Sequence, residues 1–479
     1  MQPSPLGHSA HEKASEADSG ALVLAPPPSP APRGYRFTVY LPTLNRSILQ
    51  GRPRNARRRH RFWPYFACAF FTFFALHLLL NQPRWRRWHR IPSPSSRTSG
   101  PLQCFEKVVW DATDFDLQGD FPHRARTSVE LPLSADQLYF VAEGALSHGS
   151  FEVVQAPIAS SDVALVDVQV SYHSHEALLD AAVCRLNPAP GKWGFGIFTP
   201  GWQRPRHERM LKFDIRLTLP SAPPDEPLKL HGLRTDLPLF SHHVRELGET
   251  ARFARVEFES QNTPLWVDSL TADQVVFRTT NSAIHGRYNV SSDLELMTTN
   301  AAIVAHADLL DASDREELPT DARKPPRLSL HTSNGLINAT VRCYHNRSSN
   351  ARGNGVVFGA PETPARFAIS AHTTDAPLAL AVHELPAHAV LAVTATTSNA
   401  PAQVELPRTF EGGFVLTSST FFRPTLNVTD ALGRRVTSEA ISRSSVCGAI
   451  RLGQHESEGE DEGMVDFQTS NAPIRLLLP

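Results

Sequence analysis

Two histidines and a glutamate lie together in the segment YHSHE, and zinc accepts both imidazole and carboxylate ligands. In an extended strand His173 and His175 would project from one face, with Glu176 beside them. A zinc site needs a further ligand; His242 and His243 are available, but no spacing links them to this pair. We therefore expect ordinary exposed histidines, and we predict no metal and no cofactor.

Carboxylates are the other candidates, because glycoside cleavage needs two carboxyl groups in one groove. In the C-terminal half the acidic residues on predicted strands stand apart along the sequence: Glu257, Glu259, Glu295, Glu405 and Asp466. The dense acidic runs, 308–317 and 456–462, lie in polar insertions typical of solvated loops. The motifs GxSxG and HExxH, a P-loop and a dinucleotide fingerprint are absent from the sequence. We predict no catalytic residues and no enzyme, with a membrane-anchored carbohydrate-active enzyme of β-helix type as the alternative.

Asparagine and cysteine offer modification chemistry instead. The acceptor pattern for N-glycosylation occurs at Asn289, Asn338, Asn346 and Asn427. Four cysteines also lie in this part of the chain, Cys104, Cys184, Cys343 and Cys447. In an oxidising compartment they allow three pairings, among which the sequence does not choose, and unpaired buried thiols are the alternative.

An apolar segment gives a reason to expect such a compartment. Residues 62–80, FWPYFACAFFTFFALHLLL, carry no formal charge, and as a helix they would be about 28 Å long, close to the thickness of a bilayer core. Residues 1–100 hold fifteen Lys and Arg against three Asp and Glu, and the basic excess is greater before the segment than after it. We predict a single-pass membrane protein with its N-terminus in the cytosol and its C-terminal region lumenal or extracellular.

The remaining N-terminal sequence has few residues that can form a core. Residues 1–60 are Pro-rich and basic and predict a disordered cytosolic tail, and residues 81–101 predict a short stalk. The bilayer is the expected partner of the arginine run at 52–61, and we expect no nucleic acid partner.

The C-terminal region divides into two stretches. Residues 102–250 alternate apolar and polar residues and predict a β-rich unit, with one short helix at 175–186. From 251 to 479 a phrase recurs: alternating residues, a hydroxyl pair, then Asn and a small residue, as in VVFRTTNSAIHG and LELMTTNAAIVA. The Asn of the phrase is at Asn262, Asn281 and Asn300, nineteen residues apart, and then at Asn334, Asp375, Asn399 and Asn471, with Thr420 in a weak copy.

A period near twenty residues is typical of a solenoid, in which each unit buries its apolar face against its neighbours. Asn favours tight bends, and bends stacked about 4.8 Å apart would align the Asn side chains in a ladder. Ordinary hairpins in a β-sandwich are the alternative, because hairpin turns also favour Asn. We therefore predict a mainly β chain: an irregular β-solenoid that follows a β-rich unit and is preceded by one transmembrane helix.

The phrases TTNSAIHG, TSNGLINA, TSNAPAQV and TSNAPIRL resemble the turns of adhesin-like domains of unknown function. The resemblance covers residues 251–479; Asp375 and Thr420 depart from the pattern. It implies a single-stranded β-helix with a structural or cell-surface role and carries no catalytic residues over. We therefore predict a non-enzymatic display or adhesion protein, whose partner is a cell-surface or wall glycan or a protein.

Overall fold

The computed structural model describes residues 104–110, 112–115, 120–156, 161–200, 207–221, 226–311, 324–345, 364–429, 433–452 and 462–479. The tail expected at 1–60, the span expected at 62–80 and the stalk expected at 81–101 lie outside the described residues. Residues Thr98–Pro479 group as one compact unit, which is the one described below. Among the described residues, no helix is both long enough and apolar enough to cross a bilayer.

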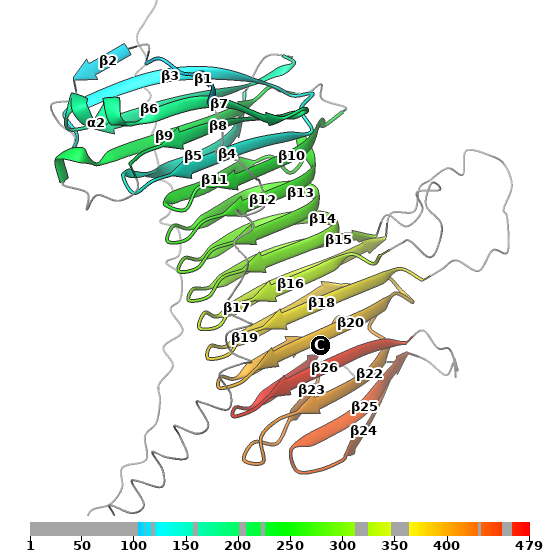
Figure 1. Cartoon of the computed structure of the whole chain (residues 1–479). Helices are drawn as coiled ribbons and strands as arrows, with labels where there is room; N and C mark the ends of the chain where they lie inside the picture. The colour runs from blue at the N-terminus through cyan, green and yellow to red at the C-terminus, as the bar shows by residue number, and fades with distance from the viewer. Residues whose placement is uncertain are drawn as a thin grey trace, which may run out of the picture. The chain divides into compact units, whose positions relative to one another are not determined.

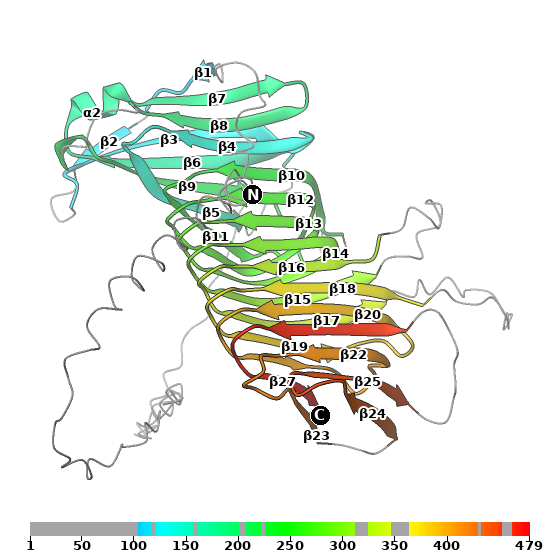
Figure 2. The same cartoon turned by 60° about the horizontal axis from the view of Figure 1, so that its bottom comes forward.

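The described chain is mainly β, and its strands join in one sheet that turns back on itself (Figures 1 and 2). The strands before residue 250 are β1 (Cys104–Lys107), β2 (Ala112–Phe115), β3 (His123–Pro132), β4 (Gln137–Glu143), β5 (Ser147–Gln155), β6 (Val163–Tyr172), β7 (Ala182–Ala189), β8 (Lys192–Phe198), β9 (Leu211–Leu219), β10 (Leu228–Asp236) and β11 (Phe240–Glu246). The strands after it are β12 (Ala251–Glu259), β13 (Leu265–Arg278), β14 (Ile284–Met297), β15 (Ile303–Asp311), β16 (Arg327–His331), β17 (Ile337–His345), β18 (Arg366–His372), β19 (Leu378–Glu384), β20 (Val390–Thr397), β21 (Ala402–Glu405), β22 (Gly412–Thr417), β23 (Thr425–Val428), β24 (Arg434–Ala440), β25 (Ser445–Leu452), β26 (Gly463–Thr469) and β27 (Ile474–Leu478).

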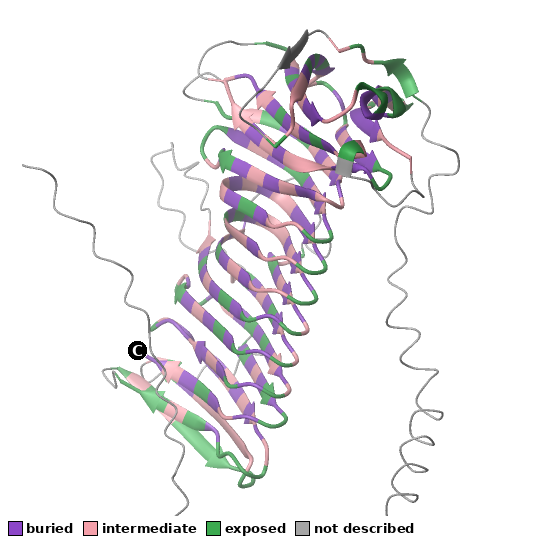
Figure 3. Cartoon of the chain, turned by 90° about the vertical axis from the view of Figure 1, so that its left-hand side faces the viewer, coloured by how far each residue is buried: buried purple, intermediate pink, exposed green. Residues whose placement is uncertain are grey.

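The strands alternate between buried and outward-facing residues, as Figure 3 shows along the repeated part of the chain. In β15, for example, Ile303, Ala305, Ala307 and Leu309 are buried while the residues between them face outward. Side chains of a strand point alternately to its two faces, so one apolar face per strand is enough to form a shared core. The inward residues of the repeated strands pack in one continuous apolar cluster.

Most strands pair in parallel, in two columns. Column A contains, in spatial order, β8, β4, β10, β12, the second half of β13, the second half of β14, and then β16, β18, β20, β26 and β22. Column B contains, in spatial order, β9, β5, β11, the first half of β13, the first half of β14, and then β15, β17, β19, β21, β27 and β23. Hairpins of a sandwich would instead produce antiparallel ladders between sequence neighbours.

The register of column A matches the nineteen-residue period. Phe258 pairs with Phe277, and Phe277 pairs with Leu296, which is one repeat length at each step. The Phe258 and Phe277 rings stack at 4.7 Å between centroids and 3° between planes. Apolar side chains at equivalent positions of successive copies therefore stack along the column.

Strand pairing continues across residue 250. In column A, β10 lies between β4 and β12, and in column B, β11 lies between β5 and β13. Towards the N-terminal side, β6 and β3 extend the sheet beyond β9 as antiparallel strands, and β7 and β1 extend it beyond β8. The β-rich unit expected at 102–250 thus shares both columns with the repeated part.

The helix expected at 175–186 is shorter. Helix α2 spans His175–Asp180, beginning after Ser174, whose side chain accepts a hydrogen bond from the Ala177 amide at 3.3 Å. The rest of the predicted helix belongs to β7, which lies between β1 and β8. Pairing on both edges, together with the burial of Cys184 and Leu186, overrides the local helix preference. A single-turn 3₁₀ helix, η2 (His207–Arg209), precedes β9.

Strand order departs from sequence order at the C-terminal end. The last two strands do not end the columns: β26 lies between β20 and β22, and β27 lies between β21 and β23. In Figure 1 the red β26 lies between the orange β20 and β22. The hairpin of β24 and β25 then continues column A in antiparallel fashion beyond β22.

Candidate functional site

The bend between the columns, which we call the corner, carries the recurring Asn. The Asn281 side-chain amide donates to Asn262 Oδ1 at 2.7 Å, and Asn300 donates to Asn281 at 2.6 Å. Asn334 continues the series by donating to Asn300 at 2.7 Å, although 34 residues separate them. Main-chain bonds run beside this series, for example from the Asn300 amide to the Thr280 carbonyl at 3.0 Å.

The series has one break, at Asp375. A second run begins there, with Asn399 donating to Asp375 Oδ1 at 2.5 Å and Asn471 donating to Asn399 Oδ1 at 2.6 Å. In each run, every Asn after the first residue of the run donates to the side chain of the corner before it in space. An ionised Asp has no N–H to donate, so the side-chain bond towards Asn334 is the one that this residue type cannot make. The main chain continues unbroken, with the Asp375 amide donating to the Ser333 carbonyl at 2.9 Å.

The first hydroxyl of each phrase lies inside the corner. These residues are buried: Ser260, Thr279, Thr298, Thr332, Thr373, Thr397, Ser418 and Thr469. Thr332 Oγ1 lies 3.2 Å from the Ala301 carbonyl and accepts from the Gly335 amide at 3.1 Å. Thr373 Oγ1 donates to the Gly335 carbonyl at 3.1 Å. The hydroxyl pair noted in the sequence thus has a role that its pattern alone did not reveal, because Thr332 and Thr373 satisfy polar main-chain groups at a buried bend. The equivalent hydroxyls of Thr397 and Thr469 are buried without a hydrogen-bond partner among the described residues.

Three of the four glycosylation acceptors lie on exposed strand positions: Asn289 on β14, Asn338 on β17 and Asn427 on β23. Asn346 lies outside the described residues.

Two of the four cysteines within the described residues form a disulfide. Cys104 on β1 is bonded to Cys184 on β7, while Cys343 and Cys447 are free. Burial raises the pKa of the Cys343 thiol to about 12, with Asp308 adding to the shift, so this thiol is unreactive at neutral pH.

The candidate metal ligands do not come together. His242 is buried; its Nδ1–H donates to the Phe240 carbonyl at 3.0 Å, and its Nε2 accepts from Thr235 at 2.8 Å. Burial lowers the His242 pKa to about 3, so the ring is neutral. His243 contacts Asp268 at 3.1 Å, and His173 packs on the Phe121 ring at 4.6 Å. Within the described ranges, no group of three or more His, Cys, Asp or Glu side chains is arranged to hold a metal ion.

Two of the five strand carboxylates singled out in the sequence pair with arginine. Glu295 bonds Arg278 at 2.8 Å, and Glu257 contacts Arg255 and Arg234.

Strand register also creates one neighbouring acidic pair that the sequence did not suggest. Asp236 on β10 is the direct partner of Glu259 on β12. Burial raises the pKa of both carboxyls, and the charge of Asp236 adds to the shift at Glu259. Tyr139, on the next strand, has its pKa raised to about 12 by burial and by Asp236. Sequence reasoning missed this cluster because Asp236 precedes the repeats, and only the fold places it beside Glu259.

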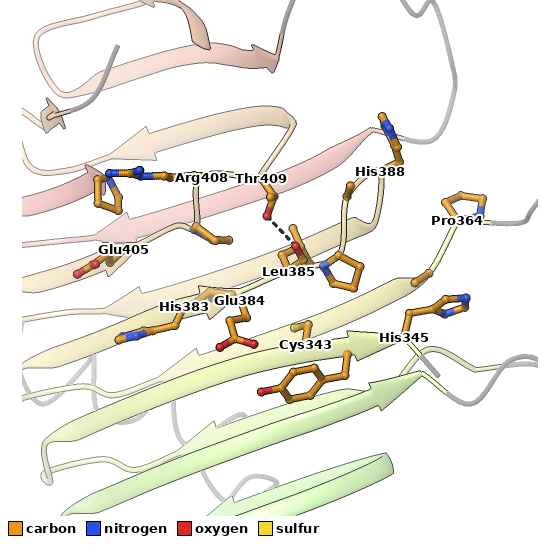
Figure 4. A pocket seen from close by; sticks show the side chains of 17 residues that line it. Cys343, His345, Pro364, His383, Glu384, Leu385, His388, Glu405, Arg408 and Thr409 are labelled. Carbon is orange, nitrogen blue, oxygen red and sulfur yellow. Dashed lines mark hydrogen bonds between the residues drawn. The ribbon is translucent and has the colours of Figure 1, made fainter. Parts of the chain in front are cut away.

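A hollow of about 1050 Å³ opens beside the ends of β17, β19 and β21 (Figure 4). Its polar lining consists of Tyr344, His345, His383, Glu384, His388, Glu405, Arg408 and Thr409, and its apolar lining includes Pro364, Leu385, Pro386 and Pro407. In Figure 4, His345 and His388 lie towards one side of the hollow and His383 and Glu405 towards the other.

Two contacts order the lining. Thr409 Oγ1 donates to the Leu385 carbonyl at 2.7 Å, which ties the connections after β19 and β21 together. Burial raises the pKa of Tyr344, as does its hydrogen bond to Glu384. The lining combines the carboxylates of Glu384 and Glu405 with the guanidinium of Arg408, so no single charge dominates. Such a lining suits a ligand rich in hydroxyl groups more than a phosphate or a nucleic acid.

Comparison with known proteins gives little beyond this geometry. Residues 274–477 match the model of a family described as a domain of unknown function, DUF7330. This stretch runs from β13 to β27 and lies within residues 251–479, the part of the chain that carries the recurring phrase. No curated protein matches. Among solved structures the chain is similar to a Clostridium sporogenes protein provisionally described as a cell adhesion protein, at 8% identity, over 74% of this chain and 100% of that chain, with a TM-score of 0.16. This likeness is too weak to transfer a fold or a function.

Proposed function

We propose that this chain is a single-pass membrane protein that displays a non-enzymatic β-solenoid outside the cytosol, for adhesion or surface binding. The Asn series at the corner is the observation that carries the proposal. Side-chain bonds link successive corners from Asn262 to Asn334 and again from Asp375 to Asn471. Repeated bonds between stacked turns suit a stiff rod that presents long flanks, and such proteins commonly bind through extended surfaces.

The hollow beside β17, β19 and β21 is the proposed contact point for a glycan. Carboxylates such as Glu384 and Glu405 accept hydrogen bonds from sugar hydroxyls, and Arg408 donates to them. The Tyr344 ring is held by Glu384 and by Arg342, whose guanidinium lies 5.7 Å from the ring centroid. A fixed aromatic ring beside polar groups is typical of sites that bind sugars through both ring faces and hydroxyls.

A glycan array with the full-length protein in detergent tests this proposal, combined with an assay for released sugar. We expect binding without turnover. Glu405→Gln and Arg408→Gln should weaken binding about tenfold, while Arg475→Gln, an exposed substitution outside the hollow, should leave it unchanged. Equal binding by all of these variants would remove the hollow from the proposal.

One specific observation favours the alternative function, a membrane-anchored carbohydrate-active enzyme. Asp236 and Glu259 are partners in the strand register, and both carboxyl pKa values are raised. A raised pKa favours the protonated form of a carboxyl group, which is the form that acts as a general acid. Neither residue lines the hollow. Sugar release by the wild type that is abolished in Asp236→Asn and in Glu259→Gln would establish this alternative in place of the scaffold.

The proposed orientation has a separate test. Glycans on Asn289, Asn338, Asn346 or Asn427 require the C-terminal region to enter the secretory pathway. We expect endoglycosidase treatment to lower the apparent mass of the wild type and to leave a variant lacking all four acceptors unchanged. A wild type that does not shift would contradict the C-out orientation.

A further inference from the structure

The two columns end differently from the way they begin. At the N-terminal side, antiparallel β6 and β3 cover β9. At the other end, β23 pairs only with β27, and β24 pairs only with β25, among the described strands. Each of these two strands therefore has one edge whose main-chain N–H and C=O groups face no described strand. Such an edge is a template for pairing with another chain.

This end also exposes several large apolar side chains. The Phe421 side chain is 89% exposed and Ile441 is 66% exposed, and Phe422 and Val428 are exposed as well. In repeat proteins the terminal unit usually carries a polar outer face, because a bare apolar end associates. We call β23, β24 and the exposed Phe421, Phe422, Val428 and Ile441 the open end.

The two edge strands differ in how they are protected. β24 carries Arg434, Arg435 and Glu439, and charged residues on an edge oppose pairing. β23 reads TLNV and has no charged residue. Its outward, exposed residue at the centre is Asn427, and this is a glycosylation acceptor, Asn427-Val428-Thr429. On an edge strand without charged residues, Asn427 thus occupies an outward position where a charge would oppose pairing, and it can carry a large hydrophilic group instead.

We propose that an N-linked glycan on Asn427 covers the open end and prevents it from pairing with the open end of a second copy of this chain. The glycan takes the place that charged residues have on β24. It is held at the rim of the apolar surface because the Thr429 amide donates to the Leu478 carbonyl at 2.9 Å, which fixes the backbone of the acceptor sequence against β27. The inference rests on the lumenal or extracellular placement in the proposed function, since the glycan is added only there.

Two variants at one residue test this with minimal change. Thr429→Ser keeps an acceptor sequence and Thr429→Ala removes it, and the main-chain bond to Leu478 needs neither side chain. The full chain, made in a glycosylating host and purified in detergent micelles, is measured by size-exclusion chromatography with light scattering. At equal micromolar concentration we expect Thr429→Ala to lose one glycan and to show an increase of about tenfold in the dimer or higher fraction, with Thr429→Ser unchanged.

A flank acceptor supplies the matched control. Thr340→Ala removes the acceptor at Asn338, which lies on the outward face of β17 between two paired strands, so loss of that glycan should leave the protein monomeric. Substituting Phe421→Ser and Phe422→Ser in the Thr429→Ala protein should restore the monomer, because the association uses the open end.

Each contrary outcome has a distinct meaning. A Thr429→Ala protein that has lost its glycan and stays monomeric would overturn the covering role. Association that persists after the phenylalanine substitutions would place the contact elsewhere and overturn the open-end interface. A wild type with glycans at Asn289 or Asn338 but none at Asn427 would overturn this inference alone, whereas absence of glycan at every acceptor would overturn the proposed orientation as well.

Discussion

The side-chain amide of Asn471 donates to Oδ1 of Asn399 at 2.6 Å, although the two residues are 72 positions apart. They are neighbours because β26 pairs with β20, on one side, and with β22 on the other. The last copy of the phrase in sequence therefore lies between two earlier copies in space. Both β26 and β27 therefore lie between strands that precede them in the sequence.

The break in the Asn series predicts a stabilising substitution. Asp375→Asn supplies the missing N–H donor towards Asn334 while keeping an oxygen for Asn399, whose bond to Asp375 is now 2.5 Å. We expect the free energy of unfolding to rise by about 0.5–1 kcal/mol, since the site is exposed to solvent. Denaturant unfolding measures the change. The reverse change, Asn300→Asp, should lower stability, because it removes the donor to Asn281; two shifts of the same sign would contradict the role assigned to the series.

The buried hydroxyls predict opposite outcomes for one substitution at two equivalent sites. Thr332 Oγ1 takes part in bonds with Ala301 and Gly335, so Thr332→Val should cost about 1–3 kcal/mol. Thr469 Oγ1 is buried and has no hydrogen-bond partner, so Thr469→Val should be neutral or stabilising. Both changes conserve side-chain shape closely, so thermal or denaturant midpoints compare them directly. An equal loss at both sites would mean that β-strand packing, not hydrogen bonding, sets the choice of threonine.

The position of β27 between two other strands predicts which part of the fold a core cavity will destabilise. Ile474 on β27 is fully buried, and Ile474→Ala should lower stability by about 2–5 kcal/mol. Because β27 lies between β21 and β23, hydrogen-exchange protection should fall in both of these strands while β12 to β14 keep theirs. The exposed neighbour Arg475→Ala is the control and should leave protection unchanged. Uniform loss across all strands would show that the columns unfold as one unit.

The buried His242 predicts a loss of stability in acid. Its pKa is lowered from 6.5 to about 3 by burial, so the unfolded chain binds a proton that the folded chain does not as the pH falls below 6.5. Folded-state stability is therefore lost in that direction, by about 2 kcal/mol between pH 6.5 and 5. Replacing both bonded partners, in Thr235→Val with His242→Leu, should make this part of the pH dependence disappear. Unfolding curves at several pH values measure it, and identical pH profiles for both proteins would contradict the assignment.

The repeated part of the fold was the more predictable half. The alternation of residues gives strands, and the constant spacing of Asn262, Asn281 and Asn300 gives their stacking, since these are local properties of the chain. The helix expected at 175–186 forms over its first half only, because pairing of β7 on both edges decided the conformation after Asp180. Cysteine pairing could not be chosen from spacing, because it depends on which strands become neighbours.

Sequence by itself determined that the chain is mainly β, which face of each strand is buried, and which residues lie at the repeated bend, because side-chain direction and turn preference act over a few residues. Tertiary structure alone decided that Asp236 meets Glu259, that a hollow opens beside β17, β19 and β21, and that the last strands lie inside the columns. These are contacts between segments far apart in the chain. Their register is set by burial of the shared core as a whole, which no local pattern specifies.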